Sequence, residues 1–283
     1  MQGIIYKILS NFYYVKIGND IIECKAKGKF KNEATDLLVG DNVIVEKIDN
    51  DKGNIIEVLP RKNKLKRPSV ANVEKLIIVM SIKSPLPDFL LLDKQLAYCV
   101  KNNIEPVICI TKIDKDVDNE FENIKDIYGK IGYPIYCVSA KECVGIDRLK
   151  EELRGCLCVF AGNSGVGKST LINAIFSKNV MISGDVSKKT GRGKHTTRHV
   201  EIIEHEGLLI TDTPGFSLFD ISEIKKDELA NCFEEFIPYV DKCEYRDCKH
   251  IKEKNCGIKE AVAEGKISQE RYKRFLEIYL ELK

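Results

Sequence analysis

A glycine-rich run at residues 162–169 has the residue types that bind phosphate groups. It reads Gly-Asn-Ser-Gly-Val-Gly-Lys-Ser and matches the pattern G-x-x-x-x-G-K-[ST]. Glycines at these spacings let backbone N–H groups turn inward around phosphate oxygens, and the helix that follows adds a favourable dipole. Lys168 is expected to reach the β- and γ-phosphates, and the Ser169 hydroxyl is expected to bind Mg²⁺. The predicted nucleotide contacts in this loop are Gly162, Asn163, Ser164, Gly165, Val166, Gly167, Lys168, Ser169 and Thr170.

Two further motifs predict that the bound base is guanine. The Asp114 carboxylate can accept hydrogen bonds from both N1–H and N2–H₂ of guanine, and adenine offers neither, so a buried site would reject it. Lys112 is expected to lie along the base, and the Ala140 N–H, after Ser139, is expected to contact the guanine oxygen. Thr111 occupies a position that is usually Asn in this motif. Its single hydroxyl is expected to weaken the packing on the phosphate loop by about one hydrogen bond, roughly 1 kcal/mol.

A third group of residues could sense the γ-phosphate. Asp212 is expected to hold Mg²⁺ through water, and the Gly215 N–H is expected to contact the γ-phosphate, the basis of order–disorder switching. The glycine-rich, basic segment 191–199 lies between this motif and the phosphate loop. Its Thr196 or Thr197 can close over Mg²⁺ and the γ-phosphate, although an ordinary surface loop is the alternative interpretation.

The residue that would orient the attacking water is missing from its usual position. Many GTPases place a Gln directly after this glycine, and here the residue is Phe216. Intrinsic hydrolysis should therefore be slow unless another group takes this role. His195 is the best internal candidate, and it could equally be structural or contact RNA. The predicted catalytic set is Lys168, Ser169, Thr196, Thr197, Asp212, Gly215 and His195.

The order of these motifs is circularly permuted. In an ordinary GTPase the phosphate loop leads and the base-reading motifs trail, but here the base-reading motifs come first. Apolar runs typical of strands buried on both faces precede the motifs, at residues 75–80, 106–110, 134–138, 156–160 and 208–210. Open α/β sheets bind ligands at the carboxyl ends of their strands. The pattern therefore predicts a central α/β P-loop GTPase domain with permuted motifs.

The C-terminal segment contains a candidate metal site. Four residues give the spacing C-x4-C-x-H-x5-C, namely Cys243, Cys248, His250 and Cys256. Such ligands suit a closed, tetrahedral, structural Zn²⁺ site, and a chance grouping among 11 cysteines is the alternative. Residues 223–236 and 268–282 are expected to be helical, which completes a helical zinc-binding domain.

The N-terminal segment is predicted to be all-β. Short runs rich in Ile, Val and Tyr, separated by turn residues, occur at 3–9, 12–17, 20–26, 42–48 and 53–59. Five short strands suit a small closed barrel of the OB-fold type. Its interleaved aromatic and lysine residues are typical of nucleic-acid binding, but such barrels also bind proteins or sugars. The basic segment 61–67 that follows is interpreted as a solvated linker.

Bulk properties exclude several classes of protein. The 283 residues carry a net charge of only +2, with 43% hydrophobic and 31% charged residues, a balance typical of soluble multidomain proteins. We expect neither a signal peptide nor a membrane span. Cysteines without an export signal indicate a reducing cytoplasm.

The full chain resembles the ribosome small-subunit-dependent GTPase A family of circularly permuted GTPases. The resemblance rests on the barrel, the permuted motifs, residues 191–197, the Asp-Thr-Pro-Gly-Phe run and the cysteine–histidine spacing. It implies a bacterial assembly factor, most simply a monomer, that binds the small ribosomal subunit and its rRNA late in maturation. It also implies GTP hydrolysis to GDP stimulated by that subunit, help in releasing another assembly factor, and one structural zinc.

The predicted domains are a barrel over 1–63, a GTPase domain over 64–220 and a zinc-binding domain over 221–283. Two other functions stay open at this point. One is an RNA-binding module in which guanine nucleotide is only a regulatory ligand. The other is a general P-loop ATPase.

Overall fold

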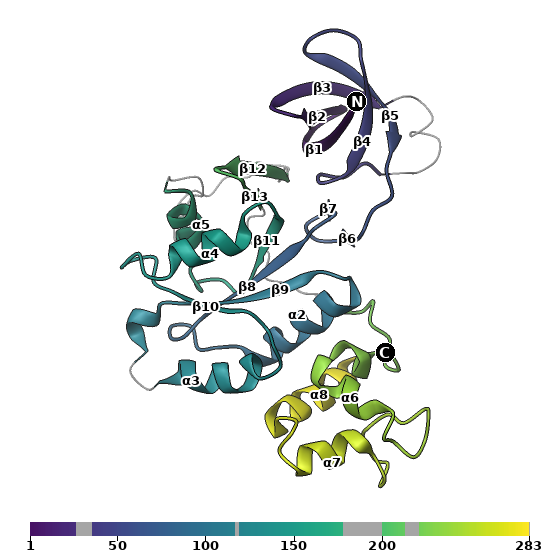
Figure 1. Cartoon of the computed structure of the whole chain (residues 1–283), viewed down its shortest axis with the longest axis vertical. Helices are drawn as coiled ribbons and strands as arrows, with labels where there is room; N and C mark the ends of the chain where they lie inside the picture. Colours follow the sequence, from purple (N-terminus) through teal and green to yellow (C-terminus); the bar gives the residue numbers. More distant parts are fainter. Residues whose placement is uncertain (27–35, 117–118, 178–199, 213–220, 283) are drawn as a thin grey trace, which may run out of the picture.

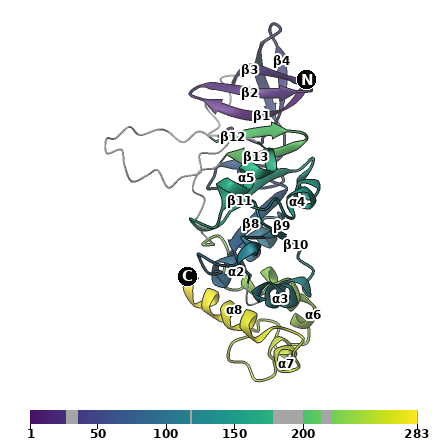
Figure 2. The same cartoon turned by 90° about the vertical axis from the view of Figure 1, so that its left-hand side faces the viewer.

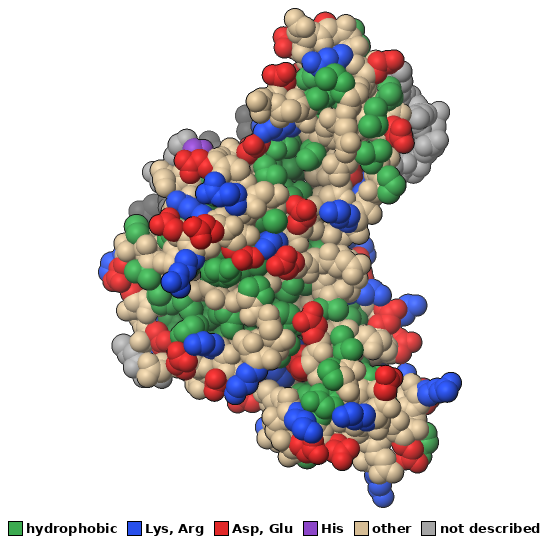
Figure 3. All heavy atoms as spheres, in the orientation of Figure 1, with side chains coloured by type: hydrophobic (Ala, Val, Ile, Leu, Met, Phe, Trp, Pro, Cys, Tyr) green, Lys and Arg blue, Asp and Glu red, His purple; other side chains and the backbone are tan. Residues whose placement is uncertain are grey.

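The computed structural model describes residues 1–26, 36–116, 119–177, 200–212 and 221–282. The chain folds into three stacked parts, with the N-terminal barrel and the helical C-terminal segment at opposite ends (Figure 1). On the face shown in Figure 3, acidic and basic side chains are interspersed over all three parts, in keeping with the near-neutral net charge. Among the described residues, no helix is both long and apolar enough to cross a membrane.

The N-terminal part is a closed five-stranded barrel, as predicted. Its strands are β1 (Gln2–Leu9), β2 (Phe12–Ile17), β3 (Asp20–Ala26), β4 (Asn42–Lys47) and β5 (Lys52–Val58). They pair in the order β1–β2–β3–β5–β4, and β4 returns to β1 to close the barrel. Alternate strand residues face inward, so Ile5, Val15, Ile22, Val43 and Ile55 are fully buried.

The basic segment after the barrel is only partly the solvated linker that the sequence suggested. Arg61 places its Nε 2.6 Å from Oδ1 of Asp41 and its Nη2 2.7 Å from Oδ2, and the Asp41 side chain is completely buried. A buried carboxylate needs such a partner, so Arg61 has a structural role. The short hairpin of β6 (Lys64–Leu65) and β7 (Val70–Ala71) follows and buries Leu65.

The central part is a six-stranded sheet with helices on both faces. Its order is β10 (Ile135–Val138), β9 (Glu105–Thr111), β8 (Lys75–Ser81), β11 (Leu157–Ala161), β13 (Leu208–Asp212) and β12 (Glu201–His205). All neighbouring pairs are parallel except β12 with β13. Residues of β8 alternate between two apolar cores, with Leu76 and Ile78 on one side and Ile77 and Val79 on the other. This explains why its sequence is continuously apolar.

Helices fill the connections between these strands. They are α2 (Phe89–Lys101), α3 (Glu120–Ile124) with η2 (Lys125–Gly129), α4 (Ile146–Leu153) and α5 (Lys168–Phe176), and η1 (Ile113–Lys115) is a single 3-10 turn. The side chains of α2 pack in one core, and those of α4 and α5 pack in the other. The helix predicted to follow the phosphate loop is therefore confirmed as α5.

The barrel joins the edge of the central sheet. Lys7 of β1 lies opposite Glu201 of β12, and their side chains form an ion pair. Glu204 of β12 accepts a hydrogen bond from the Tyr6 hydroxyl at 2.8 Å and pairs with Lys16. The strands thus form one continuous sheet that runs from the central part into the barrel (Figure 2).

The C-terminal segment is helical but more broken than predicted. It contains the 3-10 turns η4 (Leu229–Cys232) and η5 (Glu234–Phe236), then α6 (Ile237–Val240), α7 (Gly257–Ala263) and α8 (Gln269–Glu281). The predicted helix over 223–236 is wrong, because Phe233 is extended (φ −110°, ψ 101°) and separates the two turns. The rings of Phe233 and Phe236 both pack on Phe275. The spacing of the buried apolar residues in the sequence reflects this packing. The same spacing would occur in two separate turns and in one continuous helix. The predicted helix at 268–282 is confirmed as α8.

Candidate functional site

The phosphate loop connects the end of β11 to the start of α5, as the motif requires. Gly162 has φ +149°, and a Cβ at this position would lie 2.1 Å from the Val79 carbonyl oxygen, so no other residue fits. The Lys168 ammonium lies inside the loop, 2.5 Å from the Gly162 carbonyl oxygen and 3.2 Å from that of Asn163. Burial lowers the pKa of Lys168. A partly desolvated cation within the loop is suited to binding phosphate.

The base-reading loop is attached directly to the phosphate loop. The Thr111 hydroxyl lies 2.5 Å from the Val166 carbonyl oxygen, so it donates across the two loops. Lys112 adopts a left-handed conformation (φ 58°) and its Nζ lies 2.7 Å from the Gly165 carbonyl oxygen. The same ammonium also donates to the Ser84 carbonyl oxygen. The Thr111 hydroxyl thus makes a hydrogen bond between the base-reading loop and the phosphate loop, although the sequence suggested that the packing of these loops would be weakened.

The predicted guanine-reading carboxylate is held in place by its neighbour motif. The Ser139 hydroxyl donates to Oδ1 of Asp114 at 2.8 Å. This hydrogen bond is the main cause that lowers the pKa of Asp114 below its ordinary value. Ser139 and Val144 exchange two backbone hydrogen bonds that close the loop carrying Ala140. The arrangement holds the exposed, ionised Asp114 carboxylate beside the loop that carries Ala140.

The predicted switch residues are only partly described. Asp212 is the last residue of β13, which pairs with β11 beside the phosphate loop. Lys168 and Ser169 begin α5. The remaining predicted catalytic residues and Phe216 lie outside the described residues; these are His195, Thr196, Thr197, Gly215 and Phe216. The described motifs all meet at the carboxyl edge of the parallel sheet.

Sequence reasoning did not identify Asp88 as part of this site. Its Oδ1 accepts a hydrogen bond from the Leu91 N–H at 3.0 Å and caps α2. Its Oδ2 accepts from Nδ2 of Asn163 in the phosphate loop at 3.2 Å. Only the capping role had a local sequence signal, because the second contact spans 75 residues of the chain.

The four predicted metal ligands converge in the C-terminal segment. The ligand atoms of Cys243, Cys248, His250 and Cys256 all lie within 4.8 Å of one another. The His250 Nδ1 is 3.5 Å from Sγ of Cys243 and 3.4 Å from Sγ of Cys256. Ligands bound tetrahedrally at about 2.0–2.3 Å lie roughly 3.3–3.8 Å apart, so the cluster fits an ion of that kind. Burial lowers the pKa of His250 and so favours the neutral imidazole that binds metals.

Comparisons with known proteins agree with this architecture. The model of the RsgA GTPase family matches residues 58–222, and that of the RsgA N-terminal domain matches residues 2–55. Proteins from Clostridium botulinum and Clostridium beijerinckii, both named small ribosomal subunit biogenesis GTPase RsgA, are 45% and 47% identical over 283 residues, covering 100% of this chain and 97% of each relative. The chain belongs to the RsgA family.

Solved structures similar to this RsgA-family chain include one that is described as circularly permuted. YjeQ from Thermotoga maritima superposes with a TM-score of 0.87 at 36% identity, over 99% of this chain and 98% of that one. YloQ, described as a circularly permuted GTPase, gives a TM-score of 0.85 at 32% identity, over 99% and 94%. As a member of the RsgA family, the chain is a GTP-hydrolysing enzyme with a permuted order of motifs.

Proposed function

We propose that this GTPase binds the small ribosomal subunit through rRNA and assists its late maturation. The observation that carries the nucleotide part is the direct link from Thr111 to Val166, which joins a guanine-reading loop and a phosphate loop in one site. The relatives' shared name supplies the ribosomal part.

In this proposal the phosphate loop holds GTP. Lys168 binds the β- and γ-phosphates, with Thr170 among the further contacts of the loop. Mg²⁺, bound by Ser169 and through water by Asp212, would neutralise charge that develops on the phosphates. Thr196 or Thr197 and Gly215 sense the γ-phosphate. His195 orients water, because Phe216 cannot.

In this proposal the N-terminal barrel and the C-terminal segment bind the ribosome. The barrel presents lysines beside aromatic rings, for example Lys25 Nζ 5.3 Å from the centre of the Phe12 ring, a combination suited to RNA. The cysteine–histidine cluster binds one structural Zn²⁺. Hydrolysis on the correct subunit lowers affinity, frees the factor and helps to release another assembly factor. We propose a cytoplasmic monomer with domain boundaries near residues 63 and 220.

Turnover of GTP with and without purified small subunits tests this proposal. We expect slow turnover alone and strong stimulation by subunits, and unchanged turnover would refute the regulated enzyme. Lys168→Ala should abolish turnover and leave association with the subunit largely intact. Lys130→Ala, which removes a lysine whose side chain is 75% exposed and lies outside the motifs, is the matched control and should behave as wild type.

Two outcomes would favour the other functions considered above. Absence of single-turnover hydrolysis on the ribosome, with intact binding, would indicate an RNA-binding module for which nucleotide is only a ligand. Effective competition by ATP would indicate a general P-loop ATPase. If Asp114 reads guanine, Asp114→Asn should instead relax the preference for guanine over other purines.

The ionic-strength dependence of subunit binding tests the rRNA contact. Lys and Arg contacts to phosphate release counterions. The logarithm of the association constant should therefore fall linearly with the logarithm of the salt concentration. An affinity independent of salt would point to docking on ribosomal proteins.

A further inference from the structure

Helix α2 contacts the phosphate loop at its first residues and the C-terminal segment one to three turns later. At its N-terminus, the two carboxylate oxygens of Asp88 have separate tasks. One caps the helix at the Leu91 N–H, and the other accepts from the Asn163 side chain of the phosphate loop. The start of α2 is therefore hydrogen-bonded to the loop that would hold phosphate.

Gln95, within α2, lies near the same loop. Gln95 is 1% exposed, and its Nε2 has no hydrogen-bond partner among the described residues. It lines a small cavity of about 20 Å³ together with Asp88 and the loop residues Gly162, Asn163 and Val166. The cavity places the buried Gln95 side chain at the back of the phosphate loop, beside the start of α2.

Five residues after Asp88, α2 bears the centre of a buried ionic network. The Asp93 side chain is fully buried, with Oδ1 2.5 Å from Nη1 of Arg271 and 2.7 Å from the Tyr128 hydroxyl. Its Oδ2 lies 2.5 Å from Nε of Arg274. Both arginines belong to α8, so Asp93 links the C-terminal segment to the GTPase domain.

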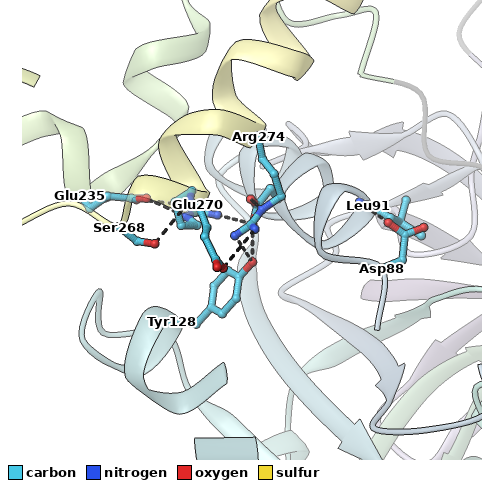
Figure 4. A network of polar contacts seen from close by, with 9 residues as sticks. Asp88, Leu91, Tyr128, Glu235, Ser268, Glu270 and Arg274 are labelled. Atoms are coloured by element: carbon cyan, nitrogen blue, oxygen red, sulfur yellow. Dashed lines mark hydrogen bonds and ion pairs between the residues drawn. The ribbon is translucent and has the colours of Figure 1, made fainter. Parts of the chain in front are cut away.

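The network is satisfied on every side. Arg271 also makes a two-point contact with Glu235, Nε to Oε1 at 2.7 Å and Nη2 to Oε2 at 3.0 Å. Figure 4 shows Arg274 reaching down from α8 toward Tyr128, with Glu235 approaching from the neighbouring turn. Loss of one partner would leave an uncompensated buried charge, so the pairing favours this seating of α8 on α2.

Two more ion pairs attach α2 to the same segment. Lys94 pairs with Glu281 of α8, and Lys101 pairs with Glu228 at 2.7 Å. A rigid helix of 13 residues thus joins the phosphate loop at one end to the C-terminal segment along its length. A change in the seating of α8 would shift or rotate α2 as a unit, since packed helices move as rigid elements.

We propose that Asp88 is a positioning residue for the phosphate loop, and that α2 transmits the seating of the C-terminal segment on Asp93 to nucleotide retention. This rests on the proposed role of the phosphate loop in binding GTP. The route is separate from the covalent connection at residues 213–220, because it needs only side-chain contacts. A ribosomal contact that displaces α8 would then speed nucleotide release.

The first test is the rate of GDP release, measured with a fluorescent GDP analogue chased by unlabelled GDP. Asp88→Ser keeps a good helix cap but is too short to reach Asn163. We expect release to be about three- to tenfold faster, the range for the net loss of one solvent-exposed hydrogen bond, with an unchanged melting temperature. Asn163→Ala should give a similar effect, and the double variant should be no faster than either single one. Additive effects, or release at the wild-type rate, would refute the positioning role.

The second test addresses transmission along α2. Arg274→Gln leaves the Arg271–Asp93 pair in place, and Arg274→Lys keeps the charge if the first variant folds poorly. Either should speed GDP release, and the effect should vanish in the Asp88→Ser background. Lys273→Gln, an exposed position on the same helix, is the matched control and should release GDP at the wild-type rate. The proposed transmission along α2, called the relay below, would be refuted if Arg274 variants release GDP at the wild-type rate. It would also be refuted if they speed release equally in the wild-type and Asp88→Ser backgrounds.

Failure of the relay can be told apart from failure of the proposed site. If Lys168→Ala binds GDP like wild type, the phosphate loop is not the nucleotide site and the proposed function is wrong. If binding depends on Lys168 but not on Asp88 or Arg274, only the relay is refuted.

Discussion

The Thr111 hydroxyl donates to the Val166 carbonyl oxygen at 2.5 Å, and so joins the end of strand β9 to the phosphate loop. Both residues are buried, at 5% and 4% exposure. Lys112 adds a second link to Gly165 on the exposed side. The position of the base-reading loop thus depends on two adjacent residues.

We predict that Thr111→Val weakens GDP binding by about 1 kcal/mol, roughly fivefold. The valine preserves shape but leaves the Val166 carbonyl without its donor, and such a loss costs about this much. Isothermal titration with GDP measures the effect. Thr111→Ser retains the hydroxyl and should bind nearly as wild type, whereas equal affinity in Thr111→Val would show that the link contributes nothing.

The acid limit of GDP binding should depend on Ser139. Its hydrogen bond lowers the pKa of Asp114, so the ionised acceptor persists above that lowered pKa and is lost only as the pH falls through it. Ser139→Ala should raise this pKa toward the ordinary value for aspartate, about 3.9. The acid limb of the GDP-affinity profile should therefore move to higher pH.

A matched control exists in the same loop. Cys143 is exposed, and Cys143→Ser should leave the acid limb of the profile where it is. An identical acid limb in Ser139→Ala would show that Asp114 does not read the base through its ionised carboxylate.

Metal removal should loosen the C-terminal segment selectively. The stretch between α6 and α7 has little apolar packing of its own beyond the cluster, so its folding should depend on the bound ion. We expect chelation to expose residues 241–256 to proteolysis while the barrel stays protected, with one equivalent of Zn²⁺ released. Cys256→Ser should reproduce this pattern, and Cys232→Ser, outside the cluster, should not. Cleavage that is unchanged by chelation would argue against a structural metal.

The buried network predicts a large loss of stability in Arg271→Met. This change leaves Glu235 without its two-point partner and Asp93 with only Arg274 among the arginines. Removing one member of a buried ionic cluster costs about 3–5 kcal/mol. Chemical denaturation measures the free energy of unfolding. Glu270→Gln, with a side chain 68% exposed, should change it by less than about 0.5 kcal/mol, and a similarly small change in Arg271→Met would contradict the assignment.

The sequence predicted the elements whose signals are local. The apolar runs before Thr111, Ser139 and Gly162 identified strands buried on both faces. The binding motifs directly after these runs indicated a parallel sheet, because open α/β sheets bind ligands at the carboxyl ends of their strands. The spacing of four ligands identified the metal cluster, because such ligands lie near one another in the chain. Both were readable without knowing the packing.

Other features depended on contacts between distant residues. Asp93 and Arg274 are 181 positions apart, and nothing near either residue marks it as paired. Arg61 was interpreted as part of a solvated linker, since its buried partner Asp41 lies 20 residues back in the barrel. The extended residue Phe233, which separates η4 from η5, was also missed. The spacing of the buried residues there reflects aromatic packing on Phe275 rather than an unbroken helix.

The pairing of β1 with β12 has a consequence for the solubility of shortened chains. Strand β12 is the antiparallel border of the central sheet, and the barrel covers its open side at Lys7 and Glu201. An uncovered border of this kind offers free backbone groups to strands of other molecules. A chain beginning after β5 would lack the pairing of Lys7 with Glu201, and we expect it to aggregate more readily than the full chain.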